Sequence, residues 1–275
     1  MFIYESYYTI NSMKKHFKKT VLFFDIDGTL VDPATGKIPS SAIEEISCWR
    51  NEGYLCVIST GRTYTTAAWT DCAHYEWDGF VGINGAEVRD PNGAVLYQNI
   101  FPPELTEKIL ETAQKLGHPV MLLDEEGFSL IGEMNDNMRT VMKLFPGRSA
   151  HGYDYHGQKV YYAMVIADTG YDYADYEKLG VHAAKSYYPY ADLVLPGTSK
   201  AIGIKAYMDA VGAKEYYAFG DSLNDQEMLK GADIAVAMGS GDPLLFPYAD
   251  IVSEPIDRDG LAKALKEIRE KKSGN

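Results

Sequence analysis

The stretch Val21-Leu22-Phe23-Phe24-Asp25-Ile26-Asp27-Gly28-Thr29-Leu30 decides the fold, because an apolar run ends in two carboxylates two residues apart. The run is rich in β-branched and aromatic residues, which is typical of a strand buried on both faces of a parallel sheet. Successive strand side chains point to opposite faces, so we expect Asp25 and Asp27 to share one side at the carboxyl end. Open parallel sheets bind ligands at that end. Taken alone, Asp27-Gly28 is equally compatible with an ordinary turn.

Length and composition fit one large domain or two smaller ones, with two preferred for 275 residues. The formal net charge of −13 argues against nucleic acid or an anionic membrane as a partner, because both attract a basic surface. No apolar run approaches the ~18 residues of a membrane span, and the three cysteines have no C-x-x-C spacing, as expected of reduced cytosolic thiols. We therefore expect a cytoplasmic protein, monomeric or a small homo-oligomer, whose partner is a small molecule.

The first residues carry no secretory signal, because they lack a hydrophobic core and a small-residue cleavage site. Met13 begins Met-Lys-Lys-His-Phe-Lys-Lys directly before the first predicted strand. Translation could start at Met1 or at Met13, and we expect residues 1–19 to be an N-terminal extension.

Strands and helices alternate over the first third of the chain. Ser41 and Glu44 form a capping-box pattern that predicts a helix ending at Gly53. A strand over 54–59, a helix over 63–74 and a strand over 80–83 follow. This order predicts a parallel sheet with right-handed crossovers.

The pattern changes between residues 85 and 189 and then returns. The middle section predicts helices over 104–116 and 135–145 and strands over 120–123, 128–131 and 159–166. After residue 190 the chain predicts helices over 199–211 and 224–230, strands over 216–219, 234–237 and 251–253, and a final helix. We therefore expect a doubly wound, Rossmann-like α/β core over 20–84 and 190–275, with an inserted α+β cap domain over 85–189.

Four polar segments fall at strand ends or helix starts: Asp25-x-Asp27-Gly28-Thr29, Thr60-Gly61-Arg62, Pro196-Gly197-Thr198-Ser199-Lys200 and Gly220-Asp221-Ser222-Leu223-Asn224-Asp225. In a doubly wound sheet such ends converge on one crevice. That crevice would hold up to four carboxylates with one lysine, and so dense a cluster of like charges is unstable without a cation. Magnesium is the natural occupant, because it prefers a few carboxylates together with phosphate and water.

These four motifs, in this order, resemble the haloacid dehalogenase superfamily, and specifically its Cof-type (class IIB) phosphatases. The resemblance covers about residues 20 to 270. It implies a Mg²⁺-dependent phosphomonoester hydrolase that acts on small phosphorylated metabolites, such as sugar phosphates, through an aspartyl phosphate. Ala201 and the stretch from Met238 to Asp242 depart from the family pattern, which argues against a close match to a characterised member.

The resemblance assigns the chemistry to the first motif. It implies that Asp25 is the nucleophile and Asp27 the general acid and base. It implies Mg²⁺ ligands in the Asp25 carboxylate, the Asp27 backbone carbonyl and Asp221. By the same resemblance Thr60 donates its hydroxyl and backbone N–H to the phosphate, with Gly61 in the same turn and a helix start behind it.

Further residues have supporting roles by the same resemblance. Lys200 would bind phosphate and Asp25, while Asn224 and Asp225 would orient Lys200 and the metal ligands. Asp225 is either a direct ligand or one water away. Arg62 either contacts substrate or pairs with a local acid, and Asn84 either lies near the substrate or only forms a tight turn.

Three other functions remain open for this motif set, one of them a catalytically silent binding protein, which is disfavoured because no motif residue is missing. A phosphomutase would share the aspartyl phosphate and return the phosphoryl group to its substrate. A receiver module would keep a phosphorylated aspartate as a signal, but it would need no general acid at Asp27, and an inserted cap would obstruct partner docking.

Overall fold

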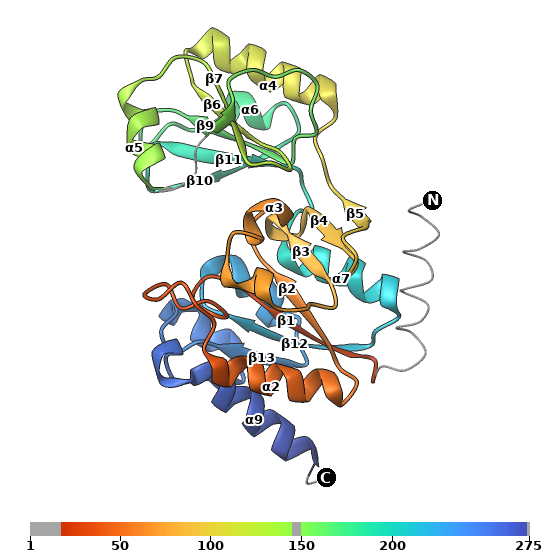
Figure 1. The fold of residues 1–275 in the computed structure, drawn as a ribbon. Coiled ribbons are helices and arrows are strands. Elements are labelled where there is room, and N and C mark those ends of the chain that lie inside the picture. The colour runs from red at the N-terminus through yellow and green to blue at the C-terminus, as the bar shows by residue number, and fades with distance from the viewer. Residues whose placement is uncertain (1–17, 145–149, 274–275) are drawn as a thin grey trace. The chain divides into compact units, whose positions relative to one another are not determined.

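The computed structural model describes residues 18–144 and 150–273 (Figure 1). The expected extension lies outside the described residues except for its last two, and so does the alternative start at Met13. The described residues divide into two compact units, one built from the segments up to Gln98 and from Ser199 onward, the other from Asn99–Thr198. We call these the core unit and the cap unit. No helix in the described ranges is long and apolar enough to cross a membrane.

The core unit contains an eight-stranded sheet in the order β14-β13-β12-β1-β2-β3-β4-β5. The first six strands in this order are parallel, and β4 and β5 are antiparallel to their neighbours. The bounds are β1 Thr20–Phe24, β2 Leu55–Ser59, β3 Phe80–Gly82, β4 Glu87–Arg89, β5 Val95–Gln98, β12 Glu215–Gly220, β13 Ile234–Ala237 and β14 Ile251–Val252. The predicted α/β class with a largely parallel sheet is therefore confirmed.

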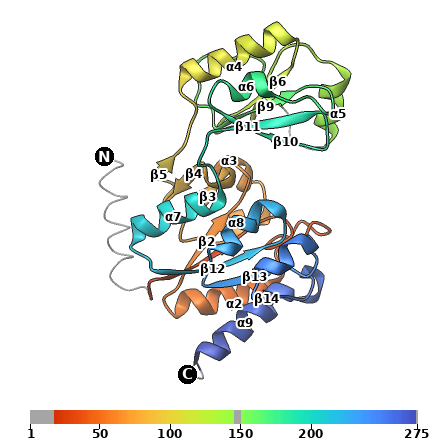
Figure 2. The same ribbon diagram turned by 180° about the vertical axis from the view of Figure 1, so that it is seen from behind.

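Helices cover both faces of this sheet, as a doubly wound fold requires (Figures 1 and 2). Strand β1 is fully buried, and its side chains pack alternately on the two faces of the sheet. Phe24 belongs to the apolar cluster that holds Trp49 of α2 (Ser40–Asn51) and also packs α9 (Gly260–Ser273). Phe23 contacts Tyr207 of α7 (Lys200–Val211) edge to face at 5.8 Å, in the cluster that also includes α8 (Gln226–Lys230).

The register of the central strands places the polar motifs together. Phe24 pairs with Phe219 of β12 and with Ile58 of β2. The residues that follow these three positions therefore leave the sheet at the same level. This edge carries three of the four motifs singled out in the sequence.

Two predicted helix features of the core unit are wrong. Helix α2 has no side-chain cap, because its N-cap is Pro39, whose side chain carries no acceptor. Ser41 lies inside the helix, and its hydroxyl donates to Asp259 Oδ1 at 2.6 Å. The helix predicted over 63–74 is broken into α3 (Tyr64–Ala67) and a 3-10 turn at Asp71–His74. Thr70 separates the two turns: it is extended and caps the second one, and its hydroxyl donates back to the Ala67 carbonyl at 2.7 Å.

The unit boundaries differ from the predicted 85–189. Strands β4 and β5 lie on the core sheet, because the turn after Asp90 folds the chain back, with the Asp90 amide donating to the Ala94 carbonyl at 2.9 Å. At the other end, β11 (Tyr190–Val194) pairs with β9 (Tyr162–Ile166) in the cap unit. Both shifts come from strand pairing across a long stretch of sequence, which local patterns do not reveal.

In its described residues, the cap unit contains a six-stranded sheet in the order β10-β11-β9-β6-β7-β8 and three helices. Its α4, β6 and β7 agree with the predicted ranges to within one residue. The apolar cluster of the unit joins Ile109 of α4 to Val165 of β9 and Tyr176 of α6. The bounds are β6 Val120–Leu123, β7 Phe128–Ile131, β8 Ala150–Gly152, β9 Tyr162–Ile166, β10 His182–Lys185, α4 Pro103–Leu116, α5 Asp136–Leu144 and α6 Ala174–Glu177.

Candidate active site

The chain turns immediately after β1, so the two aspartates do not share a side as strand neighbours. The Val31 amide donates to the Ile26 carbonyl at 2.7 Å, and the Gly28 amide donates to the Val31 carbonyl at 2.9 Å. Asp25 is buried, whereas the side chain of Asp27 is 53% exposed. The expectation that both acids face one way rested on strand alternation, which does not extend to them because β1 ends at Phe24.

Gly28 is required by its surroundings. Its φ of +85° lies in the left-handed region, which L side chains rarely adopt. A Cβ at this position would lie 2.4 Å from Asp221 Oδ2. The glycine therefore allows the loop after β1 to approach the loop after β12.

Lys200 is the first residue of α7 and is fully buried. Its Nζ donates to Asp25 Oδ1 and to Asp225 Oδ1, each at 2.6 Å. A cation opposes the dipole at a helix N-terminus, and burial by itself lowers the pKa of the ammonium group. The charges of Asp25 and Asp225 outweigh burial, so the net pKa of Lys200 is raised and the side chain stays charged.

Asp225 links the lysine to the loop after β12. Its Oδ1 holds Lys200, and its Oδ2 accepts from the backbone N–H groups of Asp221 at 3.0 Å and Ser222 at 3.1 Å. Asp221 Oδ1 in turn accepts from the Thr29 hydroxyl at 3.4 Å. The expected orienting role of Asp225 therefore has a direct structural basis.

Asn224 has different partners from those expected. Its Nδ2 donates to Asn84 Oδ1 at 3.0 Å, and its Oδ1 accepts from the Ser222 hydroxyl at 2.9 Å. It therefore positions Asn84, while the contact to Lys200 belongs to Asp225.

Three carboxylates gather beside Lys200 in an arrangement that could hold a metal ion. One oxygen from each of Asp25, Asp221 and Asp225 lies within 4.8 Å of the others. Burial raises the pKa of Asp25 to about 7 against the opposing charge of Lys200, and burial with the nearby charge of Asp225 raises the pKa of Asp221 to about 6. A single lysine leaves two negative charges uncompensated, which fits Mg²⁺, a hard divalent cation that prefers carboxylate oxygen.

Protons should compete with Mg²⁺ at this cluster. Only the ionised carboxylate binds a metal, and the raised pKa values of Asp25 and Asp221 move protonation toward neutral pH. We expect the Mg²⁺ dissociation constant to rise as the pH falls from about 8 to about 5, by up to about tenfold per pH unit for each proton displaced. Calorimetric titration with Mg²⁺ at several pH values measures this. An affinity that is flat over that range would contradict it.

The Thr60-Gly61-Arg62 segment differs in one respect from expectation. The Thr60 backbone N–H donates to the Val81 carbonyl at 2.8 Å, so the expected backbone contact to phosphate is wrong. The Thr60 hydroxyl accepts from the Arg62 amide at 3.2 Å, and its proton has no acceptor among residues 18–144 and 150–273. Thr60 is buried, and the hydroxyl is the part of it that can donate to a ligand.

The expected helix start behind Thr60 is also displaced. Helix α3 begins only at Tyr64, and its N-cap Thr63 uses its side chain to accept from the Thr66 amide. A helix of only four residues that is already capped by Thr63 provides few free backbone N–H groups for binding an anion.

Arg62 pairs with the second aspartate. Its Nε and Nη2 donate to the two carboxylate oxygens of Asp27 at 2.7 and 2.6 Å. Such a two-point contact fixes the orientation of the carboxylate. Of the two roles left open for Arg62, the structure shows the pairing with a local acid.

Asn84 is held in an unusual backbone conformation. Both Ile83 and Asn84 have positive φ, 52° and 50°, which is rare for a β-branched residue. Such strain costs on the order of 1–3 kcal/mol and tends to occur at functional sites. A Cβ on Gly61 would lie 3.2 Å from Asn84 Oδ1, so the Asn84 side chain lies directly beside the Thr60 segment.

A close contact between two glycines, which sequence reasoning missed, sets the position of α7. A Cβ on Gly203 would lie 2.6 Å from the Cα of Gly85, and a Cβ on Gly85 would collide with the Ser199 carbonyl. Helix α7 therefore packs against the turn after β3 with backbone in contact with backbone. In the sequence, this contact is indicated by Gly85 in the Asn84-Gly85 turn together with Gly203, one helical turn beyond Lys200.

Replacing Gly203 with Ala should disturb this contact. Alanine favours a helix by about 0.5–1 kcal/mol over glycine, but overpacking typically costs about 1–3 kcal/mol. We expect a lower free energy of unfolding together with a lower kcat, because Lys200 moves with α7. Chemical denaturation and turnover measure the two effects, and Ala201→Gly is the matched control, since it weakens the same helix without a collision. Unchanged kcat in Gly203→Ala would show that the contact does not position Lys200.

A family model of haloacid dehalogenase-like hydrolases matches residues 22–265. The chain belongs to this family. The membership and the fold class expected from the four motifs are therefore confirmed, and so is the expected class of enzyme, a phosphatase.

Relatives of this hydrolase extend over nearly the whole chain. YkrA of Bacillus subtilis, assigned as a phosphatase, is 28% identical over 90% of this chain and 97% of its own length. A Streptococcus pyogenes protein, assigned as a bifunctional phosphatase and peptidyl-prolyl cis–trans isomerase, is 29% identical over 91% of this chain, which spans about half (54%) of that protein. Among solved structures, a haloacid dehalogenase subclass IIB sugar phosphatase has a TM-score of 0.72 and 29% identity, covering 90% of this chain and 98% of its own.

Proposed function

We propose that this hydrolase is a Mg²⁺-dependent phosphomonoesterase that acts on small phosphate esters, such as sugar phosphates, through an aspartyl phosphate on Asp25. The observation that carries the proposal is the buried contact of Asp25 with Lys200, beside the carboxylates of Asp221 and Asp225. A related protein of known structure is a sugar phosphatase, which supports the substrate class. We also propose that the core unit is the catalytic domain and that the cap unit sets the choice of substrate.

Asp25 is placed to attack phosphorus. One carboxylate oxygen is bound by Lys200, which favours the ionised and nucleophilic form and brings positive charge to the phosphoryl group. The attack forms a bond between an Asp25 oxygen and phosphorus and breaks the bond from phosphorus to the ester oxygen. Covalent catalysis of this kind divides one difficult transfer into two easier ones.

Asp27 is proposed to protonate the leaving oxygen and then to take a proton from the water that hydrolyses the aspartyl phosphate. In the structure both its oxygens are held by Arg62. The proposal therefore requires Arg62 to release at least one oxygen when substrate binds, and an incoming phosphate dianion is a suitable competing partner for the guanidinium group. The Thr60 hydroxyl would donate a hydrogen bond to a phosphoryl oxygen.

The metal would be held by the carboxylates of Asp25 and Asp221 and by the Asp27 backbone carbonyl, with Asp225 adjacent. The carbonyl of Asp27 accepts no backbone hydrogen bond from the described part of the chain, so it is available as a ligand. When bound, Mg²⁺ would stabilise negative charge on the transferring phosphoryl group. The uncompensated negative charge beside Lys200 supports this assignment.

A screen of phosphate esters tests the proposal. Sugar phosphates, nucleotides and p-nitrophenyl phosphate are incubated with the protein, with Mg²⁺ and with a chelator, and inorganic phosphate is measured. We expect phosphate release that depends on Mg²⁺. Turnover that survives chelation would contradict the metal assignment, and transfer of phosphate to a second sugar without net release would identify a phosphomutase instead.

A further inference from the structure

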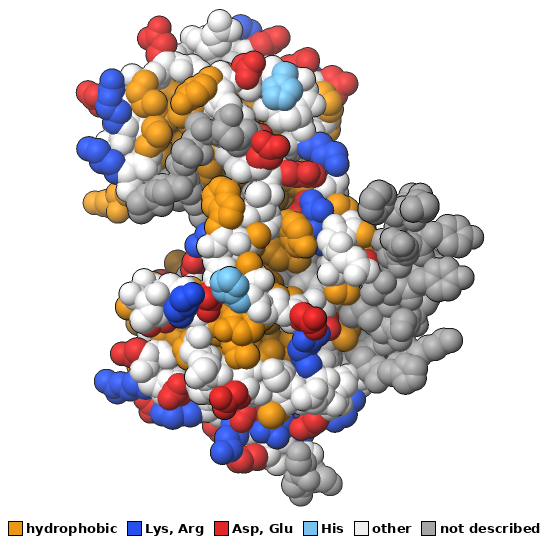
Figure 3. Space-filling model, viewed as in Figure 1, with side chains coloured by type: hydrophobic (Ala, Val, Ile, Leu, Met, Phe, Trp, Pro, Cys, Tyr) orange, Lys and Arg blue, Asp and Glu red, His pale blue; other side chains and the backbone are white. Residues whose placement is uncertain are grey.

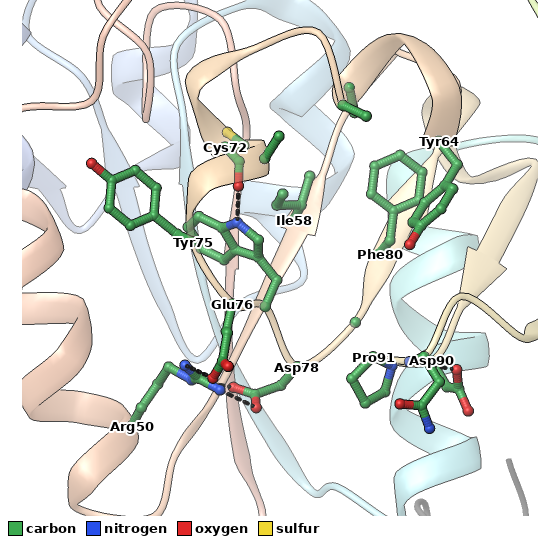
Figure 4. Close-up of a pocket in the computed structure, with 16 residues that line it drawn as sticks. Arg50, Ile58, Tyr64, Cys72, Tyr75, Glu76, Asp78, Phe80, Asp90 and Pro91 are labelled. Carbon is green, nitrogen blue, oxygen red and sulfur yellow. Dashed lines mark hydrogen bonds and ion pairs between the residues drawn. The ribbon is translucent and has the colours of Figure 1, made fainter. Parts of the chain in front are cut away.

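A second cavity lies on the core unit, apart from the candidate active site. It has a volume of about 560 Å³ and is formed within residues 50–92 (Figure 4). The lining residues come from the end of α2, from β2 and β3, from the segment after α3 and from the turn between β4 and β5. None of the active-site residues described above lines it.

The broken helix explains why this cavity exists. The chain forms only one turn at Tyr64–Ala67 and another at Asp71–His74 where the sequence predicts a continuous helix. Apolar side chains of β2 and β3, Ile58 and Phe80, are left at the floor of the resulting hollow. Its volume lies within the roughly 300–1,000 Å³ typical of small-molecule sites.

Aromatic rings surround this floor. Tyr64 meets Phe80 edge to face, with ring centroids 5.3 Å apart. Tyr75 lies on the opposite side of the hollow (Figure 4). Trp77 also lines the hollow, and its indole N–H donates to the Cys72 carbonyl at 3.0 Å. The Arg89 guanidinium group already lies 4.9 Å from the Tyr64 ring centroid, which shows that this lining attracts a cation, and its flat rings suit a planar ligand.

The charged groups of the hollow sum to a negative charge. Arg50 is paired in a two-point contact with Asp78, at 3.0 and 3.1 Å, and also lies 3.7 Å from Glu76. At the other end (Figure 4), Asp90 is 2% exposed and has no cationic partner among the residues that the structure describes. Its Oδ1 accepts from the amides of its own turn, whereas its Oδ2 is buried without any partner.

We propose that this hollow binds a small planar organic cation, such as an aromatic ring that carries an amidinium or ammonium group. The ring would lie on Ile58 and Phe80, and the cation would lie in the field of Asp90, which nothing in the described residues neutralises. A buried carboxylate oxygen without a partner, here Oδ2 of Asp90, is costly, and a cation bound nearby would reduce that cost. In the space-filling view, hydrophobic side chains gather on the surface of the core unit with charged groups beside them (Figure 3). The inference is independent of the phosphatase reaction.

Three matched probes test the proposal: benzamidine, a cation; benzamide, its neutral analogue; and benzoate, an anion. The full chain is titrated with each, and the indole N–H resonance of Trp77, assigned with a Trp77→Phe variant, is followed by NMR. We expect saturable shifts with benzamidine at millimolar concentration, as is usual for a ligand of this size, weaker shifts with benzamide and none with benzoate. Absence of saturable binding of benzamidine, or equal binding of benzoate, would overturn the proposal.

Two variants locate the site. Asp90→Asn keeps an oxygen acceptor for the amides of the turn and removes the charge, so we expect about fivefold weaker benzamidine binding, because one charge–charge attraction without direct contact is lost. Asp209→Asn, an exposed acid on α7, is the matched control and should leave binding unchanged. Ala68→Trp should fill the hollow and abolish binding. Undiminished benzamidine binding in Asp90→Asn would contradict the proposed site. If Ala68→Trp does not fold, the Asp90→Asn result alone tests the proposal.

Discussion

Replacing Asp25 with Asn is expected to lower turnover by about 10⁴-fold or more, the size of effect seen when a covalent nucleophile is removed. The substitution keeps the size of the side chain and an oxygen that can accept from Lys200, but the amide is a poor nucleophile. Lys200 and the carboxylates of Asp221 and Asp225 stay in place. The loss should therefore appear in kcat for every phosphate ester.

The measurement follows release of inorganic phosphate from p-nitrophenyl phosphate, beside Asp209→Asn as a control that changes an exposed acid. Circular dichroism checks that Asp25→Asn is folded. A companion variant, Asp27→Asn, keeps the nucleophile and removes the proposed acid and base, so phosphate should accumulate covalently on the protein. Rapid quenching and mass spectrometry detect that adduct. Turnover that persists in Asp25→Asn would exclude Asp25 as the nucleophile.

Replacing Lys200 with Met is expected to lower the free energy of unfolding by about 3–5 kcal/mol, because removing one partner of a buried ion pair leaves the other charges buried and unpaired. Two carboxylates, Asp25 and Asp225, depend on this one ammonium group for compensation. Turnover should also fall by about 10²- to 10³-fold, because a preorganised charge at the phosphoryl group is lost.

The pH dependence of this destabilisation has a definite sign. The pKa of Asp25 is already raised by burial to about 7 although Lys200 lowers it, so removing Lys200 raises this pKa further. A carboxyl whose pKa is higher in the folded than in the unfolded protein loses stability as the pH rises from the unfolded value, about 3.9, to the folded one. Lys200→Met should therefore be least damaging in mild acid and most damaging above neutrality.

Lys205→Met is the matched control for this variant. Lys205 lies on the same helix and pairs with Asp209, but both side chains are about 70% exposed, so we expect less than about 1 kcal/mol. Chemical denaturation at about pH 6 and pH 8, with and without Mg²⁺, measures both variants. Mg²⁺ should restore part of the stability of Lys200→Met. Equal, small effects of the two substitutions would mean that the buried charge cluster does not depend on Lys200.

Local sequence patterns predicted those elements whose boundaries are set by neighbouring residues. The apolar runs over 120–123, 128–131 and 234–237 are strands with the predicted limits, because turn residues close them on both sides. The helix predicted over 104–116 ends as expected, because Gly117 takes a left-handed conformation with φ of 72°. In these cases the local backbone preference and the hydrophobic pattern favour the same element, and the tertiary contacts are compatible with it.

Pairing between distant segments decided what the local patterns missed. The amide of Thr60 is used by Val81 because β2 and β3 lie side by side. Strands β4 and β5 extend the core sheet because they pair in turn onto β3, although they follow the predicted boundary at residue 84. Hydrogen bonds of this kind depend on which strands become neighbours, and no short stretch of sequence specifies that.

The sequence by itself determined the family, the parallel sheet and the residues of the candidate site, because motif spacing and apolar periodicity are local properties that survive without coordinates. Only the tertiary structure decided which of those residues contact one another. It placed Lys200 between Asp25 and Asp225, paired Asp27 with Arg62, and paired Asn224 with Asn84. The physical reason is that charge compensation in a buried site acts over a few ångströms, and those distances exist only after distant segments have been brought together, as with Asp25 and Lys200, which are 175 residues apart.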